Sequence, residues 1–129
     1  MKIYDIIAGK DFESSINLDN LLLKLKAIPK ENNMKMIFED FEVTIGIEEK
    51  IPLFLITQKE KVLVTGIIVF DDYIKNKVIR KLQEEAYNDE FIEHYRSLPV
   101  ETIVYISRRE NAIKMVEDFL NVLLNIDIQ

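Results

Sequence analysis

Apolar and polar residues alternate, or recur with helical spacing, over most of this chain, and the pattern divides it into short elements. Residues 2–8 are apolar and rich in β-branched side chains, which predicts a strand that ends at Gly9. Between residues 18 and 28, leucine and isoleucine recur at helical spacing. This spacing predicts a helix that Asn17 or a nearby serine caps and that Pro29 ends.

Four strands are predicted in the middle of the chain. Residues 34–38 and 41–47 carry their apolar side chains on opposite parities, so a turn or a bulge is expected between them. The second of these runs alternates strictly with polar residues, which predicts that one of its faces meets water. Residues 51–58 and 62–70 are apolar on both parities and predict a hairpin of buried strands.

The segment from residue 73 to residue 98 has a helical pattern, but its apolar stripe changes side part of the way along. Either one long helix is sandwiched between two layers, or the helix breaks near Asn88 and Asp89. We favour the break, because Asp89 can cap a second helix. A strand at residues 100–107 and a helix from Glu110 to about residue 126 complete the predicted elements.

The last helix has an unusually wide apolar surface. Its polar residues occupy one narrow arc of the helical wheel, and nearly all of the rest is apolar. A sheet alone covers a narrower stripe. The helix is therefore expected either to sit deep in the domain or to contribute to a subunit interface.

The order β-α-β-β-β-β-α-(α)-β-α predicts an α+β fold. We expect a single domain over residues 1–129, with a central antiparallel or mixed sheet of five to six strands and helices packed mainly on one face. The uncharged runs are much shorter than the ~20 residues that span a bilayer, and charges interrupt the first twenty residues. A soluble cytoplasmic protein without membrane contact is expected.

Composition excludes several classes of function. Seventeen basic and twenty-three acidic residues give a net charge of −6, which disfavours nucleic-acid binding. The chain has no cysteine, so disulfides, thiolate zinc sites and cysteine nucleophiles are excluded. The three glycines stand apart and form no phosphate-binding loop. Gly46 and Gly66, inside strand patterns, indicate a bulge or a close backbone contact.

Candidate chemistry follows the two strands that flank the long helical segment. If these strands are parallel neighbours, their C-terminal ends meet at one edge of the sheet. Asp71 and Asp72 would then lie close to Arg108 and Arg109, and these four residues are the predicted ligand-binding site. The structural alternative is that an aspartate caps the following helix and an arginine pairs with a carboxylate. If the chain doubles back, the strands are antiparallel and the cluster does not form.

Two weaker patterns remain. Asp40 with Glu48 and Lys50 superficially resembles the Asp plus Glu-x-Lys arrangement of restriction-endonuclease-like nucleases, although such a match is expected by chance in a chain rich in Glu and Lys. The single histidine, His94, has no histidine partner for a metal and is expected to be a half-exposed surface residue.

These patterns predict a non-enzymatic interaction or regulatory domain. It would self-associate through the last helix as a homodimer or bind a protein partner, with no cofactor, catalytic residue or metal. Two alternatives stay open. One is a metal-dependent phosphoesterase or nuclease, and the other is a domain that senses an anion or small molecule beside Arg108 and Arg109.

Overall fold

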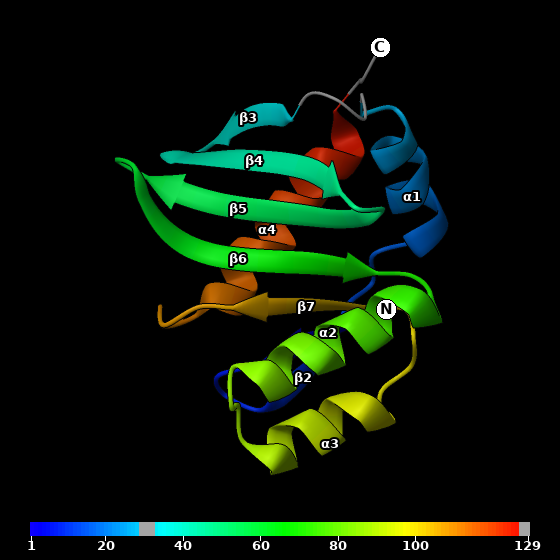
Figure 1. The fold of residues 1–129 in the computed structure, drawn as a ribbon. Coiled ribbons are helices and arrows are strands. Elements are labelled where there is room, and N and C mark those ends of the chain that lie inside the picture. The colour runs from blue at the N-terminus through cyan, green and yellow to red at the C-terminus, as the bar shows by residue number, and fades with distance from the viewer. Residues whose placement is uncertain (29–32, 127–129) are drawn as a thin grey trace.

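The computed structural model, which describes residues 1–28 and 33–126, is a single α+β domain with a seven-stranded mixed sheet and four helices (Figure 1). The elements are β1 (Lys2–Asp5), β2 (Lys10–Glu13), α1 (Leu18–Lys26), β3 (Met34–Phe38), β4 (Phe41–Glu48), β5 (Ile51–Gln58), β6 (Lys61–Val69), α2 (Asp72–Glu84), α3 (Asp89–Ser97), β7 (Thr102–Ile106) and α4 (Ala112–Asn125). The predicted α+β class and element order are confirmed, with one more strand than the upper expectation.

The strands lie in the order β2-β1-β7-β6-β5-β4-β3. Only β1 and β7 are parallel, and the other neighbouring strands are antiparallel. The additional strand arises near the start of the chain, where β1 ends at Asp5 and the backbone reverses through Gly9, whose φ is +66°. A φ in this range is accessible to glycine without strain. The four residues of β2 then pair with β1, although they are mostly charged.

Helices cover both faces of the sheet, which corrects the expectation that they pack mainly on one face (Figure 1). α1 and α4 pack on one face, and α2 and α3 pack on the other over β1, β7 and β6. Strand β7 shows the physical reason, because Ile103 and Tyr105 enter the first core while Val104 and Ile106 enter the second. A strand that is apolar on both parities needs a layer on each side.

The long helical segment is broken, as predicted. α2 ends at Glu84, and Ala86 adopts a left-handed φ of 57° before α3 begins. Asn88 caps α3, because its side chain accepts a hydrogen bond of 2.8 Å from the Glu90 amide. The cap is therefore one residue earlier than the predicted Asp89. At α1, Asn17 is the cap, as one of the predicted alternatives. Pro29, predicted to end α1, lies outside the described residues.

α4 lies against the sheet beside α1, and this position accounts for its wide apolar arc (Figure 1). Six of its residues are buried, namely Ala112, Met115, Val116, Phe119, Leu120 and Leu123. The remaining apolar residues of the helix are half-buried against the same core. Of the two positions that the sequence left open for this helix, the deep one is observed. Among the described residues, no helix is both long enough and apolar enough to cross a membrane.

Candidate binding site on the open sheet face

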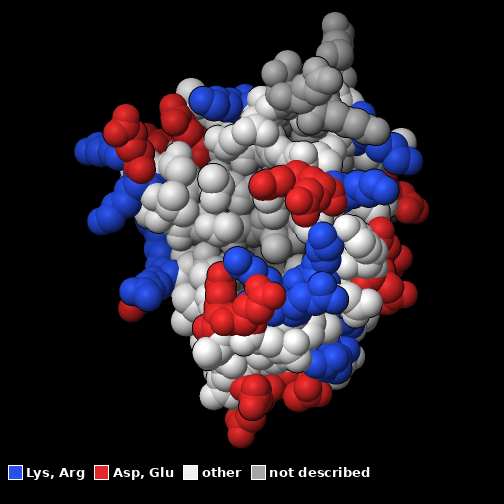
Figure 2. Space-filling model, viewed as in Figure 1, with Lys and Arg blue, Asp and Glu red and all other residues white. Residues whose placement is uncertain are grey.

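Strands β3, β4 and β5 have helices on only one side, and their other side faces solvent beyond the edge of α2 (Figure 1). We call this surface the open face; its side chains are Lys35, Ile37, Glu42, Thr44, Glu48, Leu53, Leu55, Thr57, Val62 and Thr65. Three large aliphatic side chains are exposed on it: Ile37 by 72%, Val62 by 55% and Leu55 by 37%. Figure 2 shows an uncharged area over the middle of the sheet, with acidic and basic groups at its margins.

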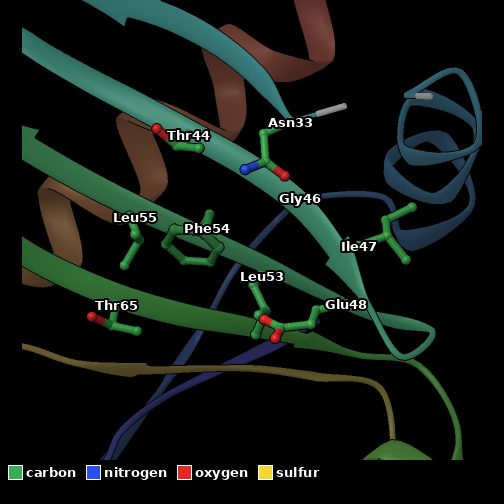
Figure 3. A pocket seen from close by; sticks show the side chains of 9 residues that line it. All are labelled: Asn33, Thr44, Gly46, Ile47, Glu48, Leu53, Phe54, Leu55 and Thr65. Carbon is green, nitrogen blue, oxygen red and sulfur yellow. The ribbon is translucent and has the colours of Figure 1, made fainter. Parts of the chain in front are cut away.

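A hollow of ≈420 Å³ lies on the open face (Figure 3). It is lined by Asn33, Thr44, Gly46, Ile47, Glu48, Leu53, Phe54, Leu55 and Thr65. The alternation of β4 turns Thr44 and Gly46 outward, opposite Leu55 and Leu53 of β5. The floor is therefore apolar, while an amide, two hydroxyl groups and a carboxylate surround it.

Both strand glycines permit a close contact, but with a neighbouring side chain and not with a second backbone segment. A Cβ atom at Gly46 would lie 2.4 Å from Oδ1 of Asn33, so the absence of a side chain lets Asn33 lie across β4 in the hollow (Figure 3). On the opposite face of the sheet, a Cβ atom at Gly66 would lie 2.0 Å from the ring of Phe54. In each case a neighbouring side chain occupies the space that a larger residue would need.

A second hollow of ≈260 Å³ continues from the first toward α2, and Glu48 and Leu53 line both. Its rim is charged. Lys77 on α2 lies 3.4 Å from Oε2 of Glu49 in the β4–β5 turn, so an ion pair links the helix to the sheet. The side chain of Tyr73 and then the Glu49 carboxylate raise the pKa of Lys77.

The polar groups of these hollows suit binding. Thr44 and Thr65 present hydroxyl groups, but no side-chain base of the described residues is within hydrogen-bond distance of either. Within residues 1–28 and 33–126, no three His, Cys, Asp or Glu side chains lie close enough together to hold a metal ion. A shallow apolar floor with hydrogen-bonding groups around it is a surface that a second molecule can cover.

The predicted cluster of two aspartates and two arginines does not form. β6 and β7 are antiparallel, with Val69 opposite Thr102 at one end. The aspartates after β6 and the arginines after β7 therefore lie at opposite ends of these strands. The physical reason is the alternative named above: α2 and α3 double back, so β7 re-enters the sheet in the opposite direction.

Each half of that predicted site has a local structural role. Asp71 caps α2, because its Oδ1 accepts a hydrogen bond of 2.8 Å from the Ile74 amide. Asp72 is the exposed first residue of the helix. The Arg109 amide donates to Oγ of Ser107 at 3.1 Å, and the Arg109 guanidinium lies 5.5 Å from the centroid of the Phe41 ring. Ligand binding by Asp71 and Asp72, or by Arg108 and Arg109, stays a prediction.

The nuclease-like trio is separated along β4. Asp40 precedes this strand, whereas Glu48 is its last residue and Lys50 lies in the next turn. An extended strand rises ~3.3 Å per residue, which places the two carboxylates roughly 25 Å apart. They cannot coordinate one metal ion.

One polar cluster was not foreseen. His94 on α3 has its Nε2 atom 2.7 Å from Oδ1 of Asp11 on β2, and Nζ of Lys2 lies 3.1 Å from the other carboxylate oxygen. The His94 side chain is 41% exposed, as predicted, and its ring lies 5.4 Å from that of Tyr4. The hydrogen bond from His94 and then the one from Lys2 lower the pKa of Asp11. These contacts hold α3 against the β1–β2 hairpin at one edge of the sheet, which we call the edge hairpin.

Comparisons with family models, with curated proteins and with solved structures found no match to this chain.

Proposed function

We propose that this protein is a non-enzymatic interaction module and that its open face binds a second copy of the chain. The observation that carries the proposal is the exposure of Ile37, Leu55 and Val62 on one side of a sheet whose other side is fully packed. Glu42 and Thr57 lie between Ile37 and Val62 on the paired strands. The open face is therefore a mixed apolar and polar surface, and interfaces between proteins share this composition.

Charge favours a second copy as the occupant. The chain carries a net charge of −6, so two copies repel each other over most of their surface. The open face carries few charges, since its charged side chains among the described residues are Lys35, Glu42 and Glu48, and the last of these lies at the end of β4. A two-fold axis can bring Lys35 of each copy beside Glu42 of the other, which makes the surface self-complementary.

This assignment moves the expected interface away from the last helix. The argument for α4 was its wide apolar arc, and the structure places those apolar residues against the sheet and α1. Three of the exposed aliphatic residues, Ile37, Leu55 and Val62, lie instead on β3, β5 and β6. The open face therefore has the free apolar area that an interface requires.

Analytical ultracentrifugation over a hundredfold range of concentration tests the proposal. We expect the wild-type protein to shift from monomer to dimer, and the double variant Ile37→Lys, Leu55→Lys to remain monomeric. Leu23→Lys is the matched control, because Leu23 is 65% exposed on α1, outside the open face. It should associate like the wild type. A monomeric wild type, or equal loss of association in the control, would contradict the proposal.

A further inference from the structure

A separate apolar cavity of ≈570 Å³ lies between α1, the β4–β5 turn and the segment that follows β6. It is lined by Leu22, Leu25, Lys26, Ile28, Ile47, Lys50, Pro52 and Phe70. Its volume is within the ~300–1,000 Å³ range of small-molecule sites. Only Ile47 also lines the hollow of the open face, so this cavity is a distinct feature.

The walls come from elements that the core holds in place. Leu25, Ile28 and Pro52 are buried, while Leu22 and Phe70 are half-buried at the sides. α1 is anchored by packing on α4, and the β4–β5 turn is fixed by two long antiparallel strands. A cavity with such supports keeps its shape without a ligand, which reduces the ordering cost of binding.

The charge at the mouth of the cavity has one sign. Among the described residues, Lys26 and Lys50 are the only charged ones that line it, and both are exposed. Within the described part of the chain, neither lysine has a carboxylate within 4.0 Å. The neighbouring Glu49 is paired with Lys77.

We infer that this cavity binds a small carboxylate with an apolar body. The apolar part would enter between α1 and Pro52, and the carboxylate would remain at the mouth beside Lys26 and Lys50. Burial of apolar surface supplies most of the affinity, since each methylene group that leaves water strengthens binding. The two ammonium groups select for an anionic head, because charge-assisted hydrogen bonds are stronger than neutral ones. This site does not depend on the open face or on dimer formation.

Displacement of the fluorescent dye 1-anilinonaphthalene-8-sulfonate provides the test, with isothermal titration calorimetry as the direct measurement. Decanoate is compared with decanol and with decyltrimethylammonium, which keep the chain and change the head group. We expect decanoate to bind most tightly. The double variant Lys26→Gln, Lys50→Gln should bind decanoate tenfold or more weakly than the wild type and bind decanol with nearly unchanged affinity.

The matched control is Lys10→Gln, Lys61→Gln, which removes the same charge from exposed positions outside the cavity. It should bind decanoate like the wild type. A second variant, Leu22→Gln, places a polar group in the wall and should weaken decanoate and decanol alike.

Three results would overturn the inference. The first is equal affinity for the three amphiphiles. The second is an equal loss of decanoate affinity in the two lysine double variants. The third is binding to phosphatidylglycerol vesicles without binding of free decanoate, which would indicate attraction to an anionic membrane surface instead of a small-molecule site. Circular dichroism of each variant shows whether the fold is retained.

Discussion

The two halves of the sheet differ in how many layers cover them. β1, β7 and the C-terminal part of β6 lie between helices on both faces, whereas β3, β4, β5 and the first part of β6 have helices on one face only. The sequences of β7 and β4 show this difference most clearly. β7 reads TIVYI and is buried on both sides, while β4 alternates apolar residues with Glu, Thr and Gly. The pattern of a single strand therefore indicates its number of covering layers.

Strand β5 departs from that rule. Its sequence, IPLFLITQ, is apolar on both parities and predicts a strand buried on both faces. In the structure only one parity is fully covered, and Leu55 is 37% exposed beside the polar residues of β4. The excess of apolar residues on an uncovered face is what the proposed self-association explains.

Polar contacts add to the packing of the covered half. Lys75 of α2 is buried and its Nζ donates to the carbonyl oxygens of Arg96 and Leu98, at 3.0 and 2.6 Å, where α3 ends. Burial lowers the pKa of Lys75. The Tyr4 hydroxyl donates to the Phe91 carbonyl oxygen at 2.9 Å. Side chains of β1 and α2 thus hold α3 in place through carbonyl groups of its backbone and its C-terminal end, in addition to the packing of its short apolar stripe.

The largest expected effect compares neighbouring residues on the two faces of β5. Ile56 is fully buried against the α4 side, and Leu55 is partly exposed on the open face. We expect Ile56→Ala to lower the free energy of unfolding by about 2–5 kcal/mol and Leu55→Ala to lower it by under ~1 kcal/mol. Urea unfolding at low protein concentration measures both. Similar losses would mean that the open face is covered within one chain.

A smaller effect is expected at the start of α2, the helix that covers the second face. The Asp71 side chain accepts a hydrogen bond from the Ile74 amide, whereas the Asp72 side chain accepts none from this amide. Replacing a capping aspartate by alanine costs about 1 kcal/mol, while loss of an exposed first-turn carboxylate costs a few tenths, roughly 0.3 kcal/mol. Thermal unfolding of Asp71→Ala and Asp72→Ala checks this order. Equal melting temperatures would refute the capping role.

Much of the fold could be predicted from the sequence. Periodicity located β3 to β6 to within one or two residues, because each alternates or is apolar and is bounded by charged turns. β2 was missed, since three of its four residues are charged and its pairing with β1 supplies the strand character. The second helical layer was missed for another reason. Periodicity shows that a face is apolar, but it does not show which helix covers it.

The site was less predictable than the fold. The proposed cluster of Asp71 with Arg109 depended on the direction of β7, and parallel and antiparallel strands have the same period of two. A cap at Asp71 or Asp72 was foreseen, because capping depends on local spacing alone, and the structure shows it at Asp71. The contact between His94 and Asp11 joins residues 83 positions apart, and Asp11 lies on the strand that the sequence did not predict.

The smallest effect concerns Asp11, which holds α3 to the edge hairpin of the covered half. Its pKa is lowered by His94 and Lys2, so it stabilises the fold above its unfolded pKa of ~3.9. That stability is lost as the pH falls through the lower, folded pKa. At pH 6 we expect the free energy of unfolding of the wild type to exceed that of Asp11→Asn by under ~1 kcal/mol, because the contact between Asp11 and His94 is partly exposed. The difference should shrink toward pH 3 in urea unfolding. At a protein concentration where the chain is monomeric, Glu42→Gln on the open face is the control, since Glu42 makes no ion pair among the described residues of one chain. If both variants showed the same pH dependence, the contact at Asp11 would not distinguish the covered half from the open one.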